Sequence, residues 1–246
     1  MEYNTFLAST IGIKMGLRFG NKKIITDGLI WMVDIGNAGS YDGTGGTVND
    51  LAGNNNATLV GSQSFATTNG GELTYETGQI TNYIRFPEAA LNSLTSGAEW
   101  TIETWLSINS TGGSTTYLHS QATSSQNNQY LVQRSGSNIS AWNETLESGS
   151  NMSFTSGTTF CFTIRHSGSS QRYYKNGVFA AQYSAANDIS LTQGWVLNQE
   201  QDSVLGGFST TQATPCSFNQ CSLYDRPLSD TEIATNFELK RARYNI

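Results

Sequence analysis

Short segments in which apolar and polar residues alternate recur along this chain, and they constrain its fold more than any other feature. In the segment 100–108, the apolar residues that fall on one face of an extended strand are Trp100, Ile102, Leu106 and Ile108. Residues 160–165 alternate in the same way. The segment 172–183 has Asn176-Gly177 at its centre, and because both residues accept positive φ, this pair indicates a two-residue hairpin.

Turns rich in glycine, asparagine, serine and threonine separate these segments from other short apolar ones. The chain has 246 residues with 25 Gly and only 3 Pro, which suits one large β-domain or two small ones. We expect further strands near 29–34, 58–59, 83–86, 130–134, 195–197 and 218–224. Many short strands joined by such turns predict an all-β fold, an antiparallel two-sheet jelly-roll sandwich.

One helix is expected near the C-terminus, over about 230–242. Ser229 and Glu232 form a capping box, and Ile233 and Phe237 then lie on one helical face. No linker interrupts 28–246, so this range is predicted to be the jelly-roll domain, closed by one short C-terminal helix. Residues 1–27 are predicted to form an arm that docks on the domain or on a neighbouring subunit.

Charge is distributed unevenly along the chain. Its net charge is −6 with a pI near 4.9, which argues against nucleic-acid binding. Residues 28–239 hold 6 basic and 17 acidic residues, a net charge of −11, whereas 1–27 carry +2 and 240–246 carry +3. Basic ends on an acidic body predict docking on an acidic partner surface; the alternative is chance together with a basic helix C-terminus. The candidate attachment residues are Lys14, Arg18, Lys22, Lys23, Arg241 and Arg243.

No apolar run approaches the roughly 18 residues that span a bilayer, so no membrane insertion is expected. The three cysteines are an odd number, and no disulfide framework is predicted. Because Cys216 and Cys221 are five residues apart in one extended segment, we expect them to project to opposite faces. The interpretation is therefore three free thiols.

The order of several motifs resembles a known family. The opening segments Gly28–Asp34, Ser40-Tyr41 and Asn49–Asn54, the central segments Trp100–Trp105 and Tyr174–Gly177, and the closing segment Leu223–Ser229 look like those of laminin-G-like, concanavalin-A-type jelly rolls. Domains of this kind are common in structural proteins of tailed bacteriophages. The resemblance covers about residues 24–246 and implies a virion protein on capsid or tail, present in several copies or as a homo-oligomer, with other virion proteins as partners.

A second resemblance concerns the segment 197–208, which is similar to the calcium loop of pentraxins. By position it implies calcium ligands at Glu200, the carbonyl of Gln201, Asp202 and Gln212, with Ser209 where the family has a further Glu. The Asn127-Asn128 pair matches an earlier pentraxin loop, with one charge lost. Calcium takes 6–8 oxygen ligands, so this set suits one weakly bound Ca²⁺ at best. The alternative is a tight loop without metal, in which Asp202 bonds turn amides.

Catalysis is not expected. Related jelly-roll glucanases place carboxylates as Glu-x-Asp-x-x-Glu along one strand, whereas Glu103 stands alone in its segment. His119 and His166 are interpreted as satisfied surface or core groups, since no Gly-x-Ser-x-Gly motif accompanies them. Trp142 and Tyr130, with Tyr117 and Trp195, are candidate platforms for sugar rings, and the alternative for all four is sheet or core packing.

Two functions follow from these observations. The first is a phage structural protein in the virion, held by its basic ends and displaying a lectin-like domain. The second is a lectin that recognises host-surface glycans through the loops at 127–128 and 200–212, with or without calcium.

Overall fold

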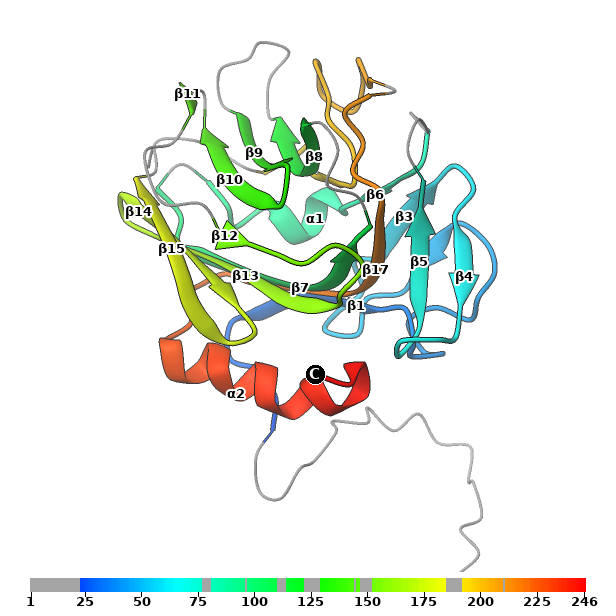
Figure 1. Cartoon of the computed structure of the whole chain (residues 1–246), viewed down its shortest axis with the longest axis horizontal. Coiled ribbons are helices and arrows are strands. Elements are labelled where there is room, and N and C mark those ends of the chain that lie inside the picture. Colours follow the sequence, from blue (N-terminus) through cyan, green and yellow to red (C-terminus); the bar gives the residue numbers. More distant parts are fainter. Residues whose placement is uncertain are drawn as a thin grey trace, which may run out of the picture.

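Two antiparallel β-sheets pack face to face, and one helix lies across the outer face of one of them (Figure 1). This computed structural model describes residues 23–76, 81–95, 97–109, 114–121, 129–143, 145–146, 152–184, 192–209 and 211–246, with the backbone alone for part of the strands between 114 and 146. The architecture confirms the prediction of an all-β jelly-roll sandwich with a short C-terminal helix.

The first sheet has eight strands in the order β15-β14-β13-β7-β17-β5-β4, with β1 paired to β17. Both β1 and β5 pair with β17. β5 pairs with the first residues of β17, and β1 pairs with its last residues. The strands are β1 (Leu29–Asp34), β4 (Ser64–Ala66), β5 (Glu72–Tyr75), β7 (Trp100–Ile108), β13 (Phe160–Ser167), β14 (Ser170–Lys175), β15 (Val178–Ser184) and β17 (Cys216–Tyr224).

The second sheet has nine strands in the order β11-β10-β9-β8-β16-β6-β3-β2, with β12 paired to β10. The strands are β2 (Thr47–Val48), β3 (Ala57–Val60), β6 (Tyr83–Arg85), β8 (Ser114–Gln121), β9 (Gln129–Ser135), β10 (Asn138–Asn143), β11 (Thr145–Leu146), β12 (Met152–Ser153) and β16 (Val196–Leu197). Most of the expected strands are present within a few residues of the predicted bounds.

The predicted hairpin joins β14 to β15. Asn176 has φ of 53° and Gly177 has φ of 76°, the positive values that this kind of two-residue turn requires. A Cβ at Gly177 would lie 3.0 Å from Cβ of Phe237 and 3.2 Å from Cα of Ala234. The turn therefore packs closely against the C-terminal helix, and glycine is needed there both for its φ and for its size.

The C-terminal helix α2 (Asp230–Lys240) begins at the predicted capping box. The Ser229 side chain accepts from the Glu232 amide at 3.2 Å, and the Glu232 carboxylate accepts from the Ser229 amide at 2.8 Å. The last turn predicted to be α-helical is instead a 3₁₀ helix, η1 (Arg241–Tyr244). A four-residue helix, α1 (Glu88–Leu91), was not predicted.

The main core lies between the two sheets and is rich in tryptophan. Trp100 contacts Trp195 edge to face at 5.6 Å, and Phe86 links Trp195 to Trp31. The four residues of β7 that alternation predicted on one face all belong to this cluster. The alternation of β7 therefore predicted its inner face correctly.

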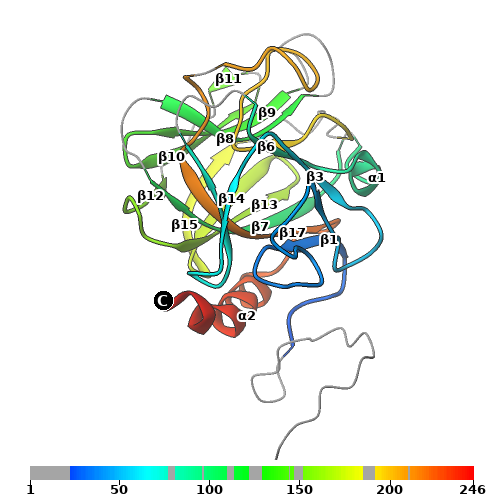
Figure 2. The same cartoon turned by 90° about the vertical axis from the view of Figure 1, so that its right-hand side faces the viewer.

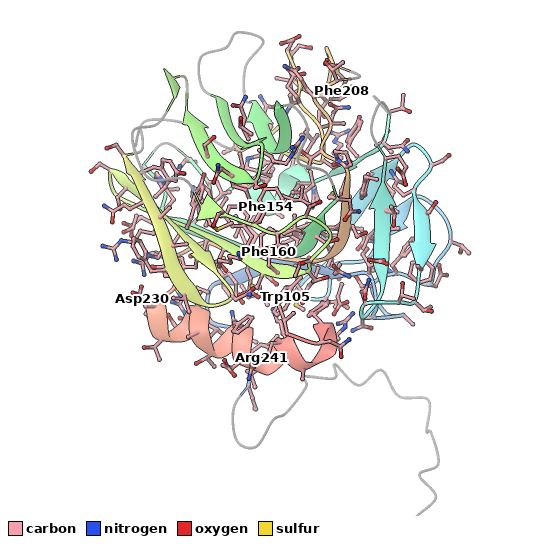
Figure 3. All side chains as sticks on the ribbon, viewed as in Figure 1. Trp105, Phe154, Phe160, Phe208, Asp230 and Arg241 are labelled. Atoms are coloured by element: carbon pink, nitrogen blue, oxygen red, sulfur yellow. The ribbon has the colours of Figure 1, made fainter. Side chains whose placement is uncertain are left out.

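In Figure 1, α2 lies across the outer face of the eight-stranded sheet. A second, smaller apolar layer joins this face to α2 and η1. Every residue of β7 and of β17 is buried, because the core covers one face of these central strands and the helices cover the other. Trp105 stacks on Phe237 at 5.7 Å and on Tyr244 at 4.2 Å. Figure 3 shows Trp105 pointing away from the main core, towards α2.

A buried ion pair lies in the same layer. Nζ of Lys240 is 2.6 Å from Oε1 of Glu103, and both residues are almost fully buried. Burial alone would lower the pKa of Lys240, but the nearby Glu103 carboxylate outweighs it and raises that pKa. The single carboxylate of β7 thus serves to hold α2 on the sheet.

The cysteines are free thiols, as expected, and all three are buried. The prediction that Cys216 and Cys221 face opposite ways was wrong, because both belong to the main core. The register of β17 shifts between Phe218 and Gln220, so Asn219 is an extra residue that reverses the alternation of every residue after it. Its side chain donates to the carbonyls of Asn69 and Gly71 at 2.9 Å each.

Candidate functional site

The candidate metal loop follows β16 and extends from the end of the sandwich opposite α2. Figure 3 places Phe208 of this loop at the far side of the molecule from Arg241. The chain leaves β16 through Asn198, whose φ of 70° turns it sharply, and residues 198–201 are then buried. We call residues 198–209 the crown loop.

Hydrogen bonds of one side chain shape this loop. The Gln201 amide nitrogen donates to the carbonyl of Gly194, and its oxygen accepts from the Leu205 amide at 2.7 Å. A tight turn follows, in which the Gly206 amide donates to the Ser203 carbonyl at 2.9 Å. Gln201, predicted as a ligand through its carbonyl, therefore also has a structural role through its side chain.

Two further residues fix the returning half of the crown loop. Gly207 has φ of 71°, and a Cβ there would lie 2.7 Å from Cβ of Asp202, so only glycine allows this close approach. The Phe208 ring packs on Tyr83 of β6 at 4.8 Å between centroids. Sequence reasoning missed these supporting roles, although Gly206-Gly207 followed by an aromatic residue was visible as a turn signal.

The crown loop brings two acidic side chains together. Glu200 is 8% exposed, and its Oε2 is buried without a hydrogen-bond partner. Burial raises the pKa of Glu200 to about 7, and the charge of Asp202 and a carboxyl–carboxyl hydrogen bond with it add to the shift. Asp202 itself is exposed. This arrangement has the electrostatic character of a site that lacks a positive charge.

Among the described residues, no contact joins the other predicted calcium ligands to Glu200 and Asp202. Gln212 is exposed, and in the described part of the chain its side chain makes no hydrogen bond to Glu200 or Asp202. Asn127 and Asn128 lie outside the described residues. Among the residues that the structure describes, no group of three His, Cys, Asp or Glu side chains is arranged to hold a metal.

The candidate sugar platforms belong to the nine-stranded sheet and the core. Trp195 is fully buried against Phe86 and Trp100, which agrees with the packing interpretation. The backbone of Tyr130 in β9 pairs with Asn143, and that of Trp142 in β10 pairs with Leu131. The side chains of Tyr130 and Trp142, and that of Tyr117, lie outside the described residues.

The histidine that the structure describes in full is a core residue. His166 is 5% exposed, and its ring stacks on Trp100 at 5.4 Å with an interplanar angle of 15°. The side chain of His119 lies outside the described residues.

The candidate attachment residues at the C-terminus have different environments. Arg243 forms a bidentate pair with Asp34 at 2.6 Å for each bond and also donates to the Gly70 carbonyl, so it joins η1 to the eight-stranded sheet. Lys240 is buried with Glu103. Arg241 is about half exposed and pairs with Glu238 at 3.0 Å. Of these three C-terminal cations, Arg241 is therefore the one that faces solvent.

The described start of the chain lies beside α2. The Ile25 amide donates to Oδ1 of Asn236 at 2.9 Å, and the hydroxyl of Tyr224 donates to the Ile25 carbonyl at 3.1 Å. Figure 2 shows this segment running down past α2. Lys23 is exposed, whereas Lys14, Arg18 and Lys22 lie outside the described residues. No helix within the described ranges is long and apolar enough to cross a membrane.

Comparison with known proteins agrees with this architecture. A family model for the concanavalin A-like lectin/glucanases superfamily matches residues 77–234, more than half of the chain. The chain belongs to this superfamily. A search of curated proteins gave no match.

Solved structures with a similar fold support the same superfamily architecture. A mutant of Trypanosoma rangeli sialidase displaying trans-sialidase activity has 13% identity and a TM-score of 0.62, over 91% of this chain and 34% of that one. The binding domain of botulinum neurotoxin DC in complex with SialylT has 14% identity and a TM-score of 0.61, over 87% of this chain and 52% of that one. The chain thus spans a third to a half of the proteins that it resembles, and at such identities the likeness concerns the fold.

Proposed function

We propose that this protein is a lectin-like carbohydrate-binding domain whose binding region is the crown loop. The observation that carries the proposal is the Glu200–Asp202 pair, a buried carboxyl with an unpartnered oxygen beside an exposed one. The superfamily is one of lectins and glucanases, and similar structures include a sialidase in complex with sialic acid and a toxin binding domain in complex with SialylT. These neighbours support a glycan as the class of ligand.

One calcium ion is part of this proposal. Calcium prefers carboxylate, amide and carbonyl oxygens, and its affinity rises with the charge of its ligands. Glu200 and Asp202 supply two carboxylates that repel each other without a cation, and the buried Oε2 of Glu200 has no other partner. The residues present fit one weakly bound ion, which would join the two carboxylates and stiffen the loop that meets the sugar.

A binding role without catalysis fits the geometry of this pair. Glycosidases place their two carboxyl groups about 5–9 Å apart, on either side of the bond that is cleaved. Glu200 and Asp202 instead belong to one loop, where the charge of Asp202 helps to raise the pKa of Glu200. We therefore propose that this pair binds a ligand and does not cleave one.

Calorimetry on chelator-treated protein tests the calcium proposal. We expect heat of binding at millimolar calcium in the natural protein and none in Glu200→Gln or Asp202→Asn. The matched control is Glu238→Gln, which removes an exposed carboxylate on α2 that pairs with Arg241 and should leave the heat unchanged. Absence of heat in the natural protein overturns the calcium part of the proposal.

A glycan array probed with the same proteins tests sugar binding directly. Spots that disappear in Asp202→Asn but not in Glu238→Gln support the crown loop as the site. An array that stays blank with and without calcium overturns the lectin function.

We also propose that the domain is a virion component, displayed on the capsid or tail of a phage in several copies. The specific observation is that the described start of the chain and helix α2 lie together, on the side opposite the crown loop (Figures 1 and 2). A base that holds the described start of the chain and α2 leaves the crown loop free to face outward. Among the described residues, Lys23 and Arg241 provide exposed cations on this base.

Salt elution tests this attachment. Because exposed charges are screened within about 3 Å at 1 M ionic strength, an electrostatic contact predicts that purified particles release the protein at molar salt. Retention at molar salt argues for an apolar anchor, and absence of the protein from purified particles overturns the virion role.

A further inference from the structure

A recess of about 500 Å³ lies on the outer face of the eight-stranded sheet, beside the start of α2. Its floor is formed by β13 and β14, and its wall by residues 226–229 and Glu232. Figure 3 labels Asp230 at this end of α2, next to β14 and β15. The recess is distant from the crown loop, which projects from the other side of the molecule (Figure 3).

The pairing of three strands arranges the outward-facing side chains here in rows. Alternate residues of these strands, Ile164, Tyr173 and Tyr183, are buried in the main core, so their neighbours face outward. The first row carries guanidinium and amide groups, the second carries hydroxyls, and the third carries the aromatic rings of Tyr174 and Phe179. The rows are Arg165–Arg172–Gln182, Ser167–Ser170–Ser184 and Thr163–Tyr174–Phe179.

Two arginines therefore stand directly opposite each other on neighbouring strands. Like charges in this position destabilise a sheet. Arg165 is neutralised within the fold, since it lies 2.6 Å from Asp230 and donates to the Leu228 carbonyl at 3.0 Å. Arg172, in contrast, makes no ion pair among the described residues.

The side chains that Arg172 contacts here are neutral. Its Nε donates to Oε1 of Gln182 at 3.0 Å, and its guanidinium lies 5.9 Å from the centre of the Phe179 ring. The other acids near the recess are engaged: Glu232 binds Arg226 through both oxygens, at 2.7 and 3.1 Å, and Glu99 accepts from the Ser167 hydroxyl at 2.7 Å. Arg172 is thus the arginine lining the recess that forms no ion pair with a described carboxylate, whereas Arg165 and Arg226 each form one.

An exposed aromatic ring borders the same charge. Phe179 is 50% exposed and Val178 is 68% exposed, and they are the large apolar side chains that the described surface leaves open. Phe179 is held in place by Tyr174, edge to face at 6.0 Å. A positioned ring beside a guanidinium and hydroxyls offers contacts to a ligand that is both anionic and partly apolar.

We propose that this recess binds a carboxylate-bearing sugar. The guanidinium of Arg172 pairs with the sugar carboxylate, a bidentate contact that its planar fork favours. The Ser170 hydroxyl and the Gln182 amide bond ring hydroxyls, and Phe179 packs against the C–H face of the ring. The site is separate from the crown loop, and it stands or falls independently of the lectin function proposed there.

An NMR titration of the full chain in chelator, which keeps the crown loop free of calcium, tests this site. The probes are glucuronate, glucose, which lacks the carboxylate, and sulfate, which lacks the ring. We expect glucuronate to shift the NMR signals of the backbone amides of Ser170, Arg172 and Gln182. Glucose is expected to bind at least about tenfold more weakly than glucuronate. No shift at these amides at about 50 mM glucuronate, or equally tight binding of sulfate, overturns the proposal.

Two variants with the same change in charge separate a specific site from general attraction. Arg172→Gln is expected to weaken glucuronate binding by about tenfold or more, because a charge-assisted contact is lost. Arg241→Gln removes an exposed cation at the far end of α2 and should leave binding unchanged. Phe179→Ala is expected to weaken binding by a few-fold. Equal losses in Arg172→Gln and Arg241→Gln contradict a built site.

Discussion

Among the residues that the structure describes, two glutamates are buried, and their surroundings are opposite. Glu103 lies under α2 with Nζ of Lys240 at 2.6 Å, so its charge is neutralised inside the fold. Glu200 lies in the crown loop beside another acid, and its pKa rises to about 7 through burial and the charge of Asp202. The first pair is complete and structural. The second pair has no cation, which is the arrangement expected of carboxylates that bind a positively charged ligand.

The same contrast holds for the elements around each residue. Every residue of β7 is buried, and Trp105 of this strand stacks on Phe237 of α2 and on Tyr244. The crown loop is held by the hydrogen bonds of Gln201, by a hydrogen bond from Cys216 to Asn198 and by the packing of Phe208 on Tyr83. Loops of this kind open at lower free energy than packed strands. The complete ion pair and the proposed calcium site therefore lie on opposite sides of one domain.

Removal of the lysine from the complete pair is expected to have the largest effect. Lys240→Met leaves the Glu103 carboxylate buried without its cation, which costs about 3–5 kcal/mol of the free energy of unfolding. Urea denaturation measures this loss.

Two further variants test the reason for that loss. Glu103→Gln combined with Lys240→Met removes both charges and should recover most of the stability, since a neutral buried pair is often tolerated. Arg241→Gln, one residue from Lys240 but exposed, should change it by less than about 0.5 kcal/mol. A loss below about 1 kcal/mol in Lys240→Met contradicts a structural role for the pair.

The incomplete pair predicts a pH dependence of smaller size. The pKa of Glu200 is raised from its ordinary 4.5 to about 7 in the folded protein, so the folded state binds the proton more tightly than the unfolded state. This contribution to stability is full below pH 4.5 and is lost as the pH rises through 7. We expect a loss of about 1–2 kcal/mol across this range in chelator.

Urea midpoints measured from pH 4.5 to pH 8 in Glu200→Gln and in the natural protein check this prediction. The variant should lack this part of the pH dependence, whereas Glu238→Gln on α2 should retain it. Millimolar calcium should also abolish the loss in the natural protein if the ion binds the two carboxylates. Identical pH profiles for Glu200→Gln and the natural protein would show that Glu200 titrates normally.

The sequence predicted those parts of the fold that local patterns determine. The inner face of β7, the Asn176-Gly177 hairpin and the capping box at Ser229 each depend on residues a few positions apart. The pairing of Glu103 with Lys240 joins residues 137 positions apart, and no local pattern indicates it. The faces of Cys216 and Cys221 were predicted wrongly because one extra residue, Asn219, shifts the register within β17.

The sequence indicated some residues of the candidate site and missed others. The resemblance of the crown loop indicated Glu200 and Asp202, and the structure brings these two together. It did not indicate that the Gln201 side chain would shape the loop. The recess beside Arg172 depends on the register of three strands and on α2, so only the assembled sheet reveals it.

An exposed ion pair provides the reference for both buried glutamates. Its loss is expected to change the free energy of unfolding least. Arg85 of β6 and Glu88 of α1 are 3.0 Å apart, and their side chains are 42% and 48% exposed. Water and salt screen such a pair, so Glu88→Gln should change the free energy of unfolding by about 0–0.5 kcal/mol. Urea denaturation in low and in molar salt checks this, and the difference from the natural protein should shrink at high salt. A loss as large as that of Lys240→Met would mean that burial does not set the strength of ion pairs in this fold, and the distinction between Glu103 and Glu200 would then need another cause.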